Sequence, residues 1–382
     1  MTRGSDSDFV GFVFSALTTN TTHFYKVLRA IAPKPARGQA NGPLDTAAAA
    51  GGDTFVLTTI TADGIAFSVG DMHTGMGRLY LRRNLFSDYS YRPDKPPGYD
   101  DGDDDGDDDD GDEHASVTFK LSLDRLIICL QMFAVDAGGA AGNATNPAAG
   151  GAGVGAAAPE DASTCRMIYQ GAGHPFLLVF RQPSTSLVTT CEFNTLDLDP
   201  TEPAEDDDNT GEDGALRMDL SNVALQLIIA GRVMADAVSE LRAIDTEVLT
   251  LRAARASTPR FALLSHGKIG LSQFSFPEDT GGGTPLFERF MVNAPPAEEE
   301  EEGADPNPDV VVVNSYTFGQ ILKAQDAMAL ATRVSIRCDA HGYMSIQSMY
   351  ELGTGTAIFI DFRFCALQDD DLTERLERLG YD

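Results

Sequence analysis

The sequence predicts an α+β protein with two similar halves, each containing two helices packed on antiparallel β-sheet. Three observations support this class. Runs of β-branched and aromatic residues mark many short strands, and a few stretches with apolar residues spaced i, i+3, i+4 and i+7 mark helices. The order of strands and helices also repeats after residue 213. The repeat concerns this pattern and not residue identity, so we expect a tandem structural duplication.

In the first half, strands are predicted to surround two helices. A strand at 9–18 leads to a helix capped by Thr21 or Thr22, and a second helix starts after the cap residue Ser122. The inward face of the first helix is Phe24, Val27, Leu28 and Ile31, and that of the second is Leu123, Leu126, Ile127 and Leu130. The other strands are expected at 54–61, 65–69, 77–81, 116–121, 165–170, 176–181 and 187–194.

In the second half, a strand at 222–230 leads to a helix from Gly231 to about residue 244. Its predicted inward residues are Met234, Ala237, Val238 and Leu241. A second helix is expected at about 315–330, with Phe318, Ile321 and Leu322 directed inward. The other strands are expected at 247–252, 260–265, 269–276, 310–313, 333–337, 343–350 and 357–364.

Low-complexity segments interrupt this pattern and define the expected domains. Segments 34–52, 92–115, 137–158, 197–213 and 279–309 are rich in Ala, Gly, Pro or acids, and such compositions cannot bury enough apolar surface to fold. We therefore expect acidic and Ala/Gly-rich disordered inserts. The predicted domains are 9–196 and 214–366, joined by an acidic connector at 197–213 and followed by an acidic tail at 367–382.

The net charge of −30 is concentrated in three of these segments. Residues 100–113 contain eleven acids, and residues 202–213 and 298–309 contain seven each. Without these 25 acids, the remaining 33 face 28 Lys and Arg, so the folded part is expected to be nearly neutral. The overall charge thus does not exclude a nucleic-acid partner.

The remaining composition excludes several classes of protein. No apolar run approaches the roughly 18 residues of a membrane helix, and the N-terminus lacks the pattern of a secretory signal. The histidines show no metal-ligand spacing, and no C-x-x-C pair occurs among Cys129, Cys165, Cys191, Cys338 and Cys365. We expect a soluble protein of a reducing compartment, without a cofactor or metal.

Every predicted helix carries a basic residue on its polar side. These residues are Lys26, Arg29, Arg125, Arg232, Arg242 and Lys323. They could contact an anionic partner, or they could belong to an ordinary solvated face, since Asp124, Asp236, Glu240 and Asp326 share the same helices. From the pattern alone, the solvated face is the favoured interpretation.

Several stretches resemble the Rad-one/Rec-one family, whose members are the middle subunit of the nine-one-one DNA-damage checkpoint clamp. They are 9–31, LFSDYSY at 85–91, CRMIYQGAGHPF at 165–176, TTCEFNT at 189–195, and RVSIRCDAHGYMSIQSMY at 333–350. The resemblance implies a DNA-clamp (PCNA-like) fold, with two tandem domains of curved sheet. It also implies a heterotrimeric ring with two other clamp subunits, whose helices line the hole.

The resemblance further implies a site and partners. Lys26, Arg125 and Lys323 match positions where clamps carry a basic residue facing the hole, whereas Arg29, Arg232 and Arg242 are chosen from helix geometry. Asp236 and Ser239 stand where related subunits place arginines, which weakens the expectation for that helix. The implied partners are double-stranded DNA bound without sequence specificity, an ATP-dependent clamp loader, and repair and checkpoint proteins in the nucleus.

The alternative function is a 3′–5′ DNA exonuclease acting in repair, because such activity has been attributed to some relatives. Metal-dependent cleavage requires two or more carboxylates held on rigid elements. The regions expected to be ordered offer Asp63, Asp71, Asp124, Asp245, Asp339 and Asp361, and turns or helix starts account for several of them. No nuclease motif is found, so we predict a binding protein without catalytic residues.

Overall fold

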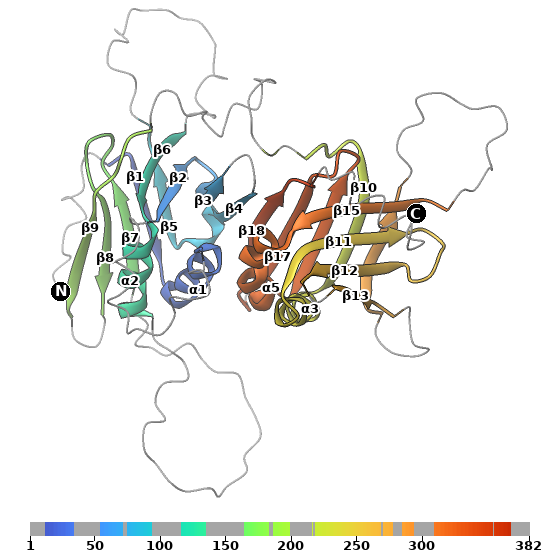
Figure 1. Cartoon of the computed structure of the whole chain (residues 1–382). Helices are drawn as coiled ribbons and strands as arrows, with labels where there is room; N and C mark the ends of the chain where they lie inside the picture. Colours follow the sequence, from blue (N-terminus) through green and yellow to red (C-terminus); the bar gives the residue numbers. More distant parts are fainter. Residues whose placement is uncertain are drawn as a thin grey trace, which may run out of the picture. The chain divides into compact units, whose positions relative to one another are not determined.

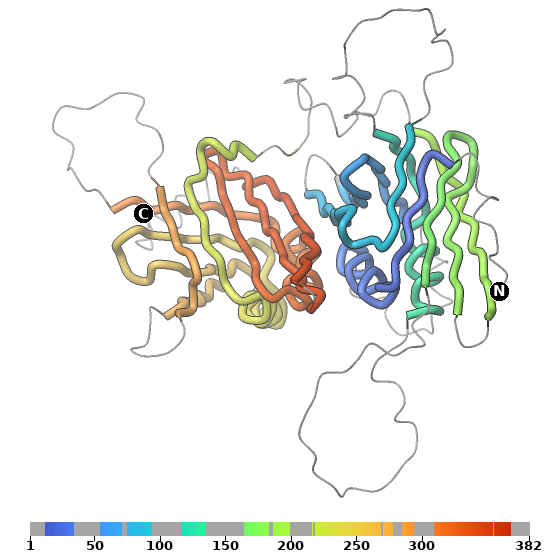
Figure 2. The backbone as a smooth tube through the Cα atoms, turned by 180° about the vertical axis from the view of Figure 1, so that it is seen from behind, coloured from blue at the N-terminus to red at the C-terminus, as the bar shows by residue number. Residues whose placement is uncertain are grey.

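The computed structural model describes residues 12–33, 54–71, 75–93, 116–134, 164–182, 186–198, 216, 218–268, 270–277, 285–293, 309–353 and 355–367. The chain forms two compact units (Figures 1 and 2). The N-terminal unit contains residues 1–29, 35–67 and 80–202, and the C-terminal unit contains 30–34, 68–79 and 203–382. Most residues of the five predicted inserts and of the tail lie outside the described residues.

The N-terminal unit contains a five-stranded antiparallel sheet of order β5-β1-β7-β8-β9. These strands are β1 (Phe14–Thr18), β5 (Asp88–Tyr91), β7 (Thr164–Tyr169), β8 (Phe176–Arg181) and β9 (Val188–Phe193). Four further strands follow the order β4-β3-β2-β6, although the end of β3 and most of β4 belong to the segment 68–79 of the C-terminal unit. They are β2 (Phe55–Ile60), β3 (Gly64–Asp71), β4 (Gly75–Arg82) and β6 (Val117–Ser122), with a 3₁₀ turn at Arg83–Leu85. The helices are α1 (Thr21–Ile31) and α2 (Leu123–Phe133).

Buried aromatic rings connect these strands and helices. Phe119 of β6 stacks on Tyr169 of β7, with ring centroids 4.4 Å apart, and contacts Phe176 of β8 at 5.8 Å. Phe24 of α1 contacts Phe86 edge-on at 5.5 Å. Because such rings bury large apolar areas, they form the centre of the core and fix α1 against the sheet.

The C-terminal unit also combines two antiparallel arrangements of strands. One has the order β14-β10-β16-β17-β18, and the other has the order β13-β12-β11-β15. The first comprises β10 (Val223–Ala230), β14 (Phe287–Val292), β16 (Arg333–Asp339), β17 (Met344–Glu351) and β18 (Ala357–Phe364). The second comprises β11 (Thr246–Ala254), β12 (Phe261–Gly267), β13 (Gly270–Ser275) and β15 (Val311–Thr317). The helical segments are α3 (Gly231–Ala243), α4 (Phe318–Ile321), η4 (Leu322–Ala324) and α5 (Gln325–Leu330).

One face of the β10-containing sheet is apolar and buried. Leu225, Leu227 and Ile229 of β10 are fully buried, and they pair with Cys338, Ile336 and Val334 of β16, which are buried as well. Helix α3 contacts β10 and β16, and it also contacts α5 (Figure 1). Side chains alternate along a strand, so the residues between these positions belong to the opposite face of the sheet.

The structure corrects several predicted elements. Strand β14 lies inside the predicted insert 279–309, and β5 was not predicted. Phe287 and Phe290 of β14 contact Phe261 of β12 at 5.8 and 6.5 Å, which gives the strand a hydrophobic anchor. The last helix begins at Phe318 and not at 315, because β15 continues to Thr317 and pairs there with Val248. It is also divided into α4, η4 and α5.

Smaller differences concern helix faces and strand ends. Cys129 and Ala235 are buried, whereas Ile127, Ala237 and Leu322, which were predicted to point inward, are only half-buried. Strand β1 begins at Phe14, after the predicted start at residue 9. No helix in the described part of the chain is long and apolar enough to cross a membrane.

Candidate nucleic-acid interface

Helix α1 presents a basic face without acids. Its buried side is Phe24, Val27, Leu28 and Ile31, as predicted, and Lys26 and Arg29 are exposed on the other side. The Arg29 Nη1 donates a hydrogen bond to the Tyr25 hydroxyl at 3.0 Å, which orients the guanidinium. Burial, followed by the charge of Lys26, lowers the pKa of His23, so His23 is neutral at pH 7 and the positive charge comes from Lys26 and Arg29.

Helix α2 begins as the sequence predicts. The Ser122 hydroxyl accepts a hydrogen bond from the Arg125 backbone N–H at 3.4 Å, which is the N-cap interaction. Arg125 is exposed in the first turn. Its neighbour Asp124 accepts a bond from the Thr54 backbone N–H at 2.9 Å, so this carboxylate fastens α2 to the start of β2.

Helix α3 has a mixed outer face. The Arg232 and Asp236 side chains are 90% and 69% exposed and form an i,i+4 pair with 3.8 Å between Nε and Oδ2. Arg242 is half-buried near the end of the helix, and Ser239 and Glu240 are exposed. Arg232 therefore pairs with Asp236, and with Glu240 the helix carries two acids for its two arginines, so its charge is balanced.

Lys323 lies in the 3₁₀ segment η4 and is half-buried. Asp326 follows in the first turn of α5. Because α3 contacts α5, the structure brings Lys323 and the α3 arginines onto neighbouring segments of one unit. Lys26 and Arg29 share one helix, and Arg125 belongs to another helix of the N-terminal unit.

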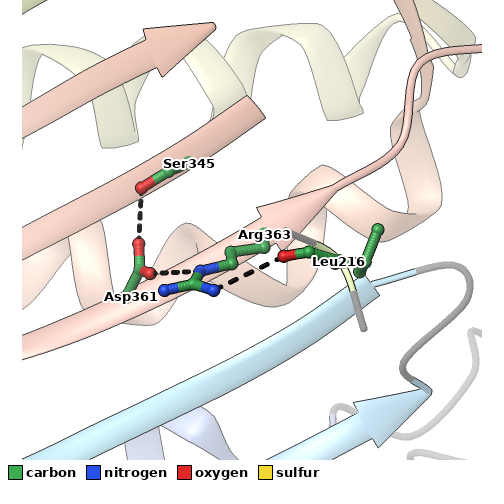
Figure 3. A network of polar contacts seen from close by, with 4 residues as sticks. All are labelled: Leu216, Ser345, Asp361 and Arg363. Atoms are coloured by element: carbon green, nitrogen blue, oxygen red, sulfur yellow. Dashed lines mark hydrogen bonds and ion pairs between the residues drawn. The ribbon is translucent and has the colours of Figure 1, made fainter. Parts of the chain in front are cut away.

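Three of the carboxylates considered for metal-dependent cleavage, Asp124, Asp339 and Asp361, have structural partners. Asp339 is buried, and its oxygens accept bonds from the backbone N–H groups of Asp219, His341 and Tyr343 at 2.9–3.0 Å. Asp361 accepts from Ser345 and Arg363 (Figure 3). No group of three or more His, Cys, Asp or Glu that could hold a metal occurs among the described residues. Nothing in this part of the chain favours the exonuclease alternative.

An apolar groove beside α2 was not predicted from the sequence. It has a volume of about 510 Å³ and lies between α2 and β9, lined by Phe55, Ile128, Met132, Cys191 and Leu196 among others. The Ile128 and Met132 side chains are 50% and 66% exposed. Strand β9 ends its sheet, so its outer edge has no strand partner among the described residues. An unpaired edge beside exposed apolar side chains is typical of a surface that another chain covers.

None of the five cysteines forms a disulfide. Burial raises the pKa of the Cys129 and Cys165 thiols, and it raises the pKa of Cys338 to about 12. These three thiols are therefore protonated at neutral pH and behave as small apolar core residues.

Comparison with known proteins points to one family. The family model described as "Repair protein Rad1/Rec1/Rad17" matches residues 13–350. The human cell cycle checkpoint protein RAD1 is 26% identical over 264 residues, which cover 69% of this chain and 72% of the human protein. The DNA damage checkpoint control protein RAD17 of Saccharomyces cerevisiae is 22% identical over 337 residues, which cover 87% of this chain and 64% of the yeast protein.

Proposed function

The chain belongs to the Rad1/Rec1/Rad17 family of repair proteins, and from this premise we propose that it is one subunit of a heterotrimeric checkpoint clamp that encircles DNA. Family membership supports a role in the DNA-damage checkpoint, DNA repair and the cell cycle. It also supports a nuclear location. The clamp subunit holds DNA and partners in place and carries out no bond-making chemistry.

In this proposal the chain forms two tandem clamp domains, 9–196 and 214–366, joined by the connector 197–213. These bounds differ from the two compact units, because 30–34 and 68–79 group with the C-terminal unit. The repeated order of elements supports it. In each unit a first strand is followed directly by a helix, then by a group of strands, a second helical segment and three final strands. Such an order is what a duplicated domain would produce.

The observation that carries the DNA-binding part is the basic face of α1. Lys26 and Arg29 are the exposed residues of α1, whose other residues are buried or half-buried, and α1 contains no acid. Lys and Arg on such a face bind phosphates without reading the base sequence. Lys26, Arg125 and Lys323 are the proposed principal contacts, Arg29 adds to α1, and Arg232 and Arg242 contribute less.

Assembly with two other clamp subunits would use edge strands. We expect a neighbouring subunit to extend the sheet at β9 and to place an apolar side chain in the groove between α2 and β9. This arrangement would cover Ile128 and Met132 and remove the unpaired edge. An ATP-dependent loader and repair and checkpoint proteins are the further partners of such a ring.

The test is co-expression with the two partner subunits, followed by native mass measurement. We expect a one-to-one-to-one assembly, and Met132→Asp should reduce it strongly because a carboxylate would be desolvated in the groove. Charge reversal of Lys26 and Lys323 should leave the assembly intact and weaken DNA retention, and Arg125 is left unchanged in this variant because it also lines the groove beside α2. A protein that stays monomeric in the presence of both partners would contradict the proposal.

A further inference from the structure

Four arginines lie together on the polar face of the β14-β10-β16-β17-β18 sheet. They are Arg289 on β14, Arg333 and Arg337 on β16, and Arg363 on β18. We call these four residues the outer arginine field. The folded part of the chain is expected to be nearly neutral, so four arginines on one sheet face make that face locally positive and suited to a partner of opposite charge.

The strand register places the field on one face. Arg337 pairs with Gln226 on one side and Ser345 on the other, and Ser345 pairs in turn with Arg363. Arg289 pairs with Ile228, which is two residues further along β10. Neighbouring strands are about 4.8 Å apart and residues rise about 3.4 Å each, so the four Cα atoms span roughly 20 Å by 13 Å.

This face is opposite to the buried one. The alternating residues Leu225, Leu227, Val334 and Ile336 are buried in the core, whereas Arg289 and Arg333 are exposed and Arg337 is half-buried. The Arg333 and Arg363 side chains are 51% and 37% exposed. A partner could therefore reach the guanidinium groups without rearrangement of the sheet.

Carboxylates of the same unit already bind two of these arginines. Arg333 pairs with Glu288 at 2.9 Å, and Arg363 pairs with Asp361 at 2.9 Å while its Nη1 donates to the Leu216 carbonyl (Figure 3). The Arg337 Nε is buried and has no hydrogen-bond partner among the described residues. Two of the four arginines of the field thus already bind carboxylates of their own unit.

We propose that the outer arginine field binds an extended acidic segment of a partner protein. Carboxylates would pair with Arg289 and Arg337, and the amides and hydroxyls of Gln226, Gln347 and Ser335 lie between the cations to bind the peptide backbone. A DNA duplex fits less well, because Asp361 and Glu288 would repel a continuous row of phosphates. A peptide can place neutral residues opposite these two carboxylates.

The proposal is tested by fluorescence anisotropy on the full chain. The probe is a labelled twelve-residue peptide of alternating aspartate and glutamate, and the reference is a peptide of alternating asparagine and glutamine. We expect the acidic peptide to bind at 50 mM NaCl and to bind about tenfold more weakly at 300 mM, since salt screens exposed charges. The reference peptide should not bind.

Substitutions test whether the acidic peptide binds at the outer arginine field. Arg289→Gln with Arg337→Gln should weaken acidic-peptide binding about tenfold. Arg83→Gln with Arg181→Gln removes the same charge from exposed positions elsewhere and should change it less than twofold. Arg289→Gln alone, at an exposed position, should show part of the loss and keeps the test valid if the half-buried Arg337 is needed for folding.

Three results would overturn the proposal. They are equal binding of both peptides, equal losses in the two double variants, and a loss of duplex-DNA binding in the field variant as large as its loss of peptide binding. The last result would identify the field as a nucleic-acid surface. Failure of heterotrimer assembly would contradict the clamp proposal, whereas peptide binding by the chain would be unaffected, so the two failures can be distinguished.

Discussion

Helices α1 and α3 occupy equivalent places in the order of elements, directly after the first strand of each unit, yet they differ in charge and in packing. Helix α1 exposes Lys26 and Arg29 and contains no acid, whereas the arginines of α3 are balanced by Asp236 and Glu240. Helix α3 also packs closely against α5. In the proposed clamp, this difference assigns DNA binding to α1 and mainly a packing role to α3.

The largest expected effect concerns the packing of α3. A Cβ added at Gly231 would clash with the carbonyl oxygens of Met328 and Ala331 at the end of α5. Gly231→Ala should therefore lower the free energy of unfolding by about 3 kcal/mol, measured by urea denaturation. Gly319→Ala is the matched control in α4, because no atom lies within 4 Å of its added Cβ, and it should be neutral or stabilising. Similar effects of both variants would refute the close packing of α3 on α5.

The second-largest expected effect is a loss of affinity for duplex DNA. Lys26→Gln with Arg29→Gln removes the two exposed charges of α1, and we expect about tenfold weaker binding to duplex DNA at 100 mM salt. The slope of log K against log salt should fall by about two, since each lost phosphate contact releases about one counterion fewer. Arg232→Gln with Arg242→Gln should cost less than threefold. An equal loss from the α3 pair would remove the proposed difference between the helices.

Much of the fold was predictable because hydrophobic periodicity is a local signal. Strand β18 (Ala357–Phe364) has the predicted bounds, and its burial alternates along its whole length. Helix α3 ends one residue before the predicted end. Strand β14 was missed because its support is non-local. It depends on pairing with β10 and on Phe261 of β12, and neither contact is visible in the segment itself.

The candidate sites also differ in whether the sequence alone predicts them. The basic residues of the helices could be named from spacing alone, and so could the i,i+4 pair of Arg232 with Asp236. The groove beside α2 and the outer arginine field could not. They arise where residues distant in sequence, such as Met132 with Cys191 or Arg337 with Arg363, are brought together by sheet order and register.

A smaller effect on stability is expected from substitutions at the N-caps of α2 and α3. Ser122 caps α2 with its hydroxyl, whereas Ala230 precedes α3 without a side-chain cap. Ser122→Ala should lower the free energy of unfolding by about 1 kcal/mol, and Ala230→Ser should raise it by about half as much. Thermal unfolding monitored by circular dichroism measures both. If Ser122→Ala is neutral, the hydrogen bond to the Arg125 N–H contributes nothing to stability.

The smallest expected effect comes from a substitution that makes the charge of α3 more like that of α1. Asp236→Asn removes the carboxylate that faces Arg232 across an exposed 3.8 Å pair, and such pairs contribute little to stability, so the fold should be unchanged. Arg232 is then available to phosphate, and DNA affinity should rise about two- to threefold with a steeper salt dependence. The control is Glu247→Gln, which removes one negative charge from β11, where Glu247 pairs with Lys268. If both variants raise affinity equally, the gain reflects net charge alone, and α3 has no place at the DNA surface.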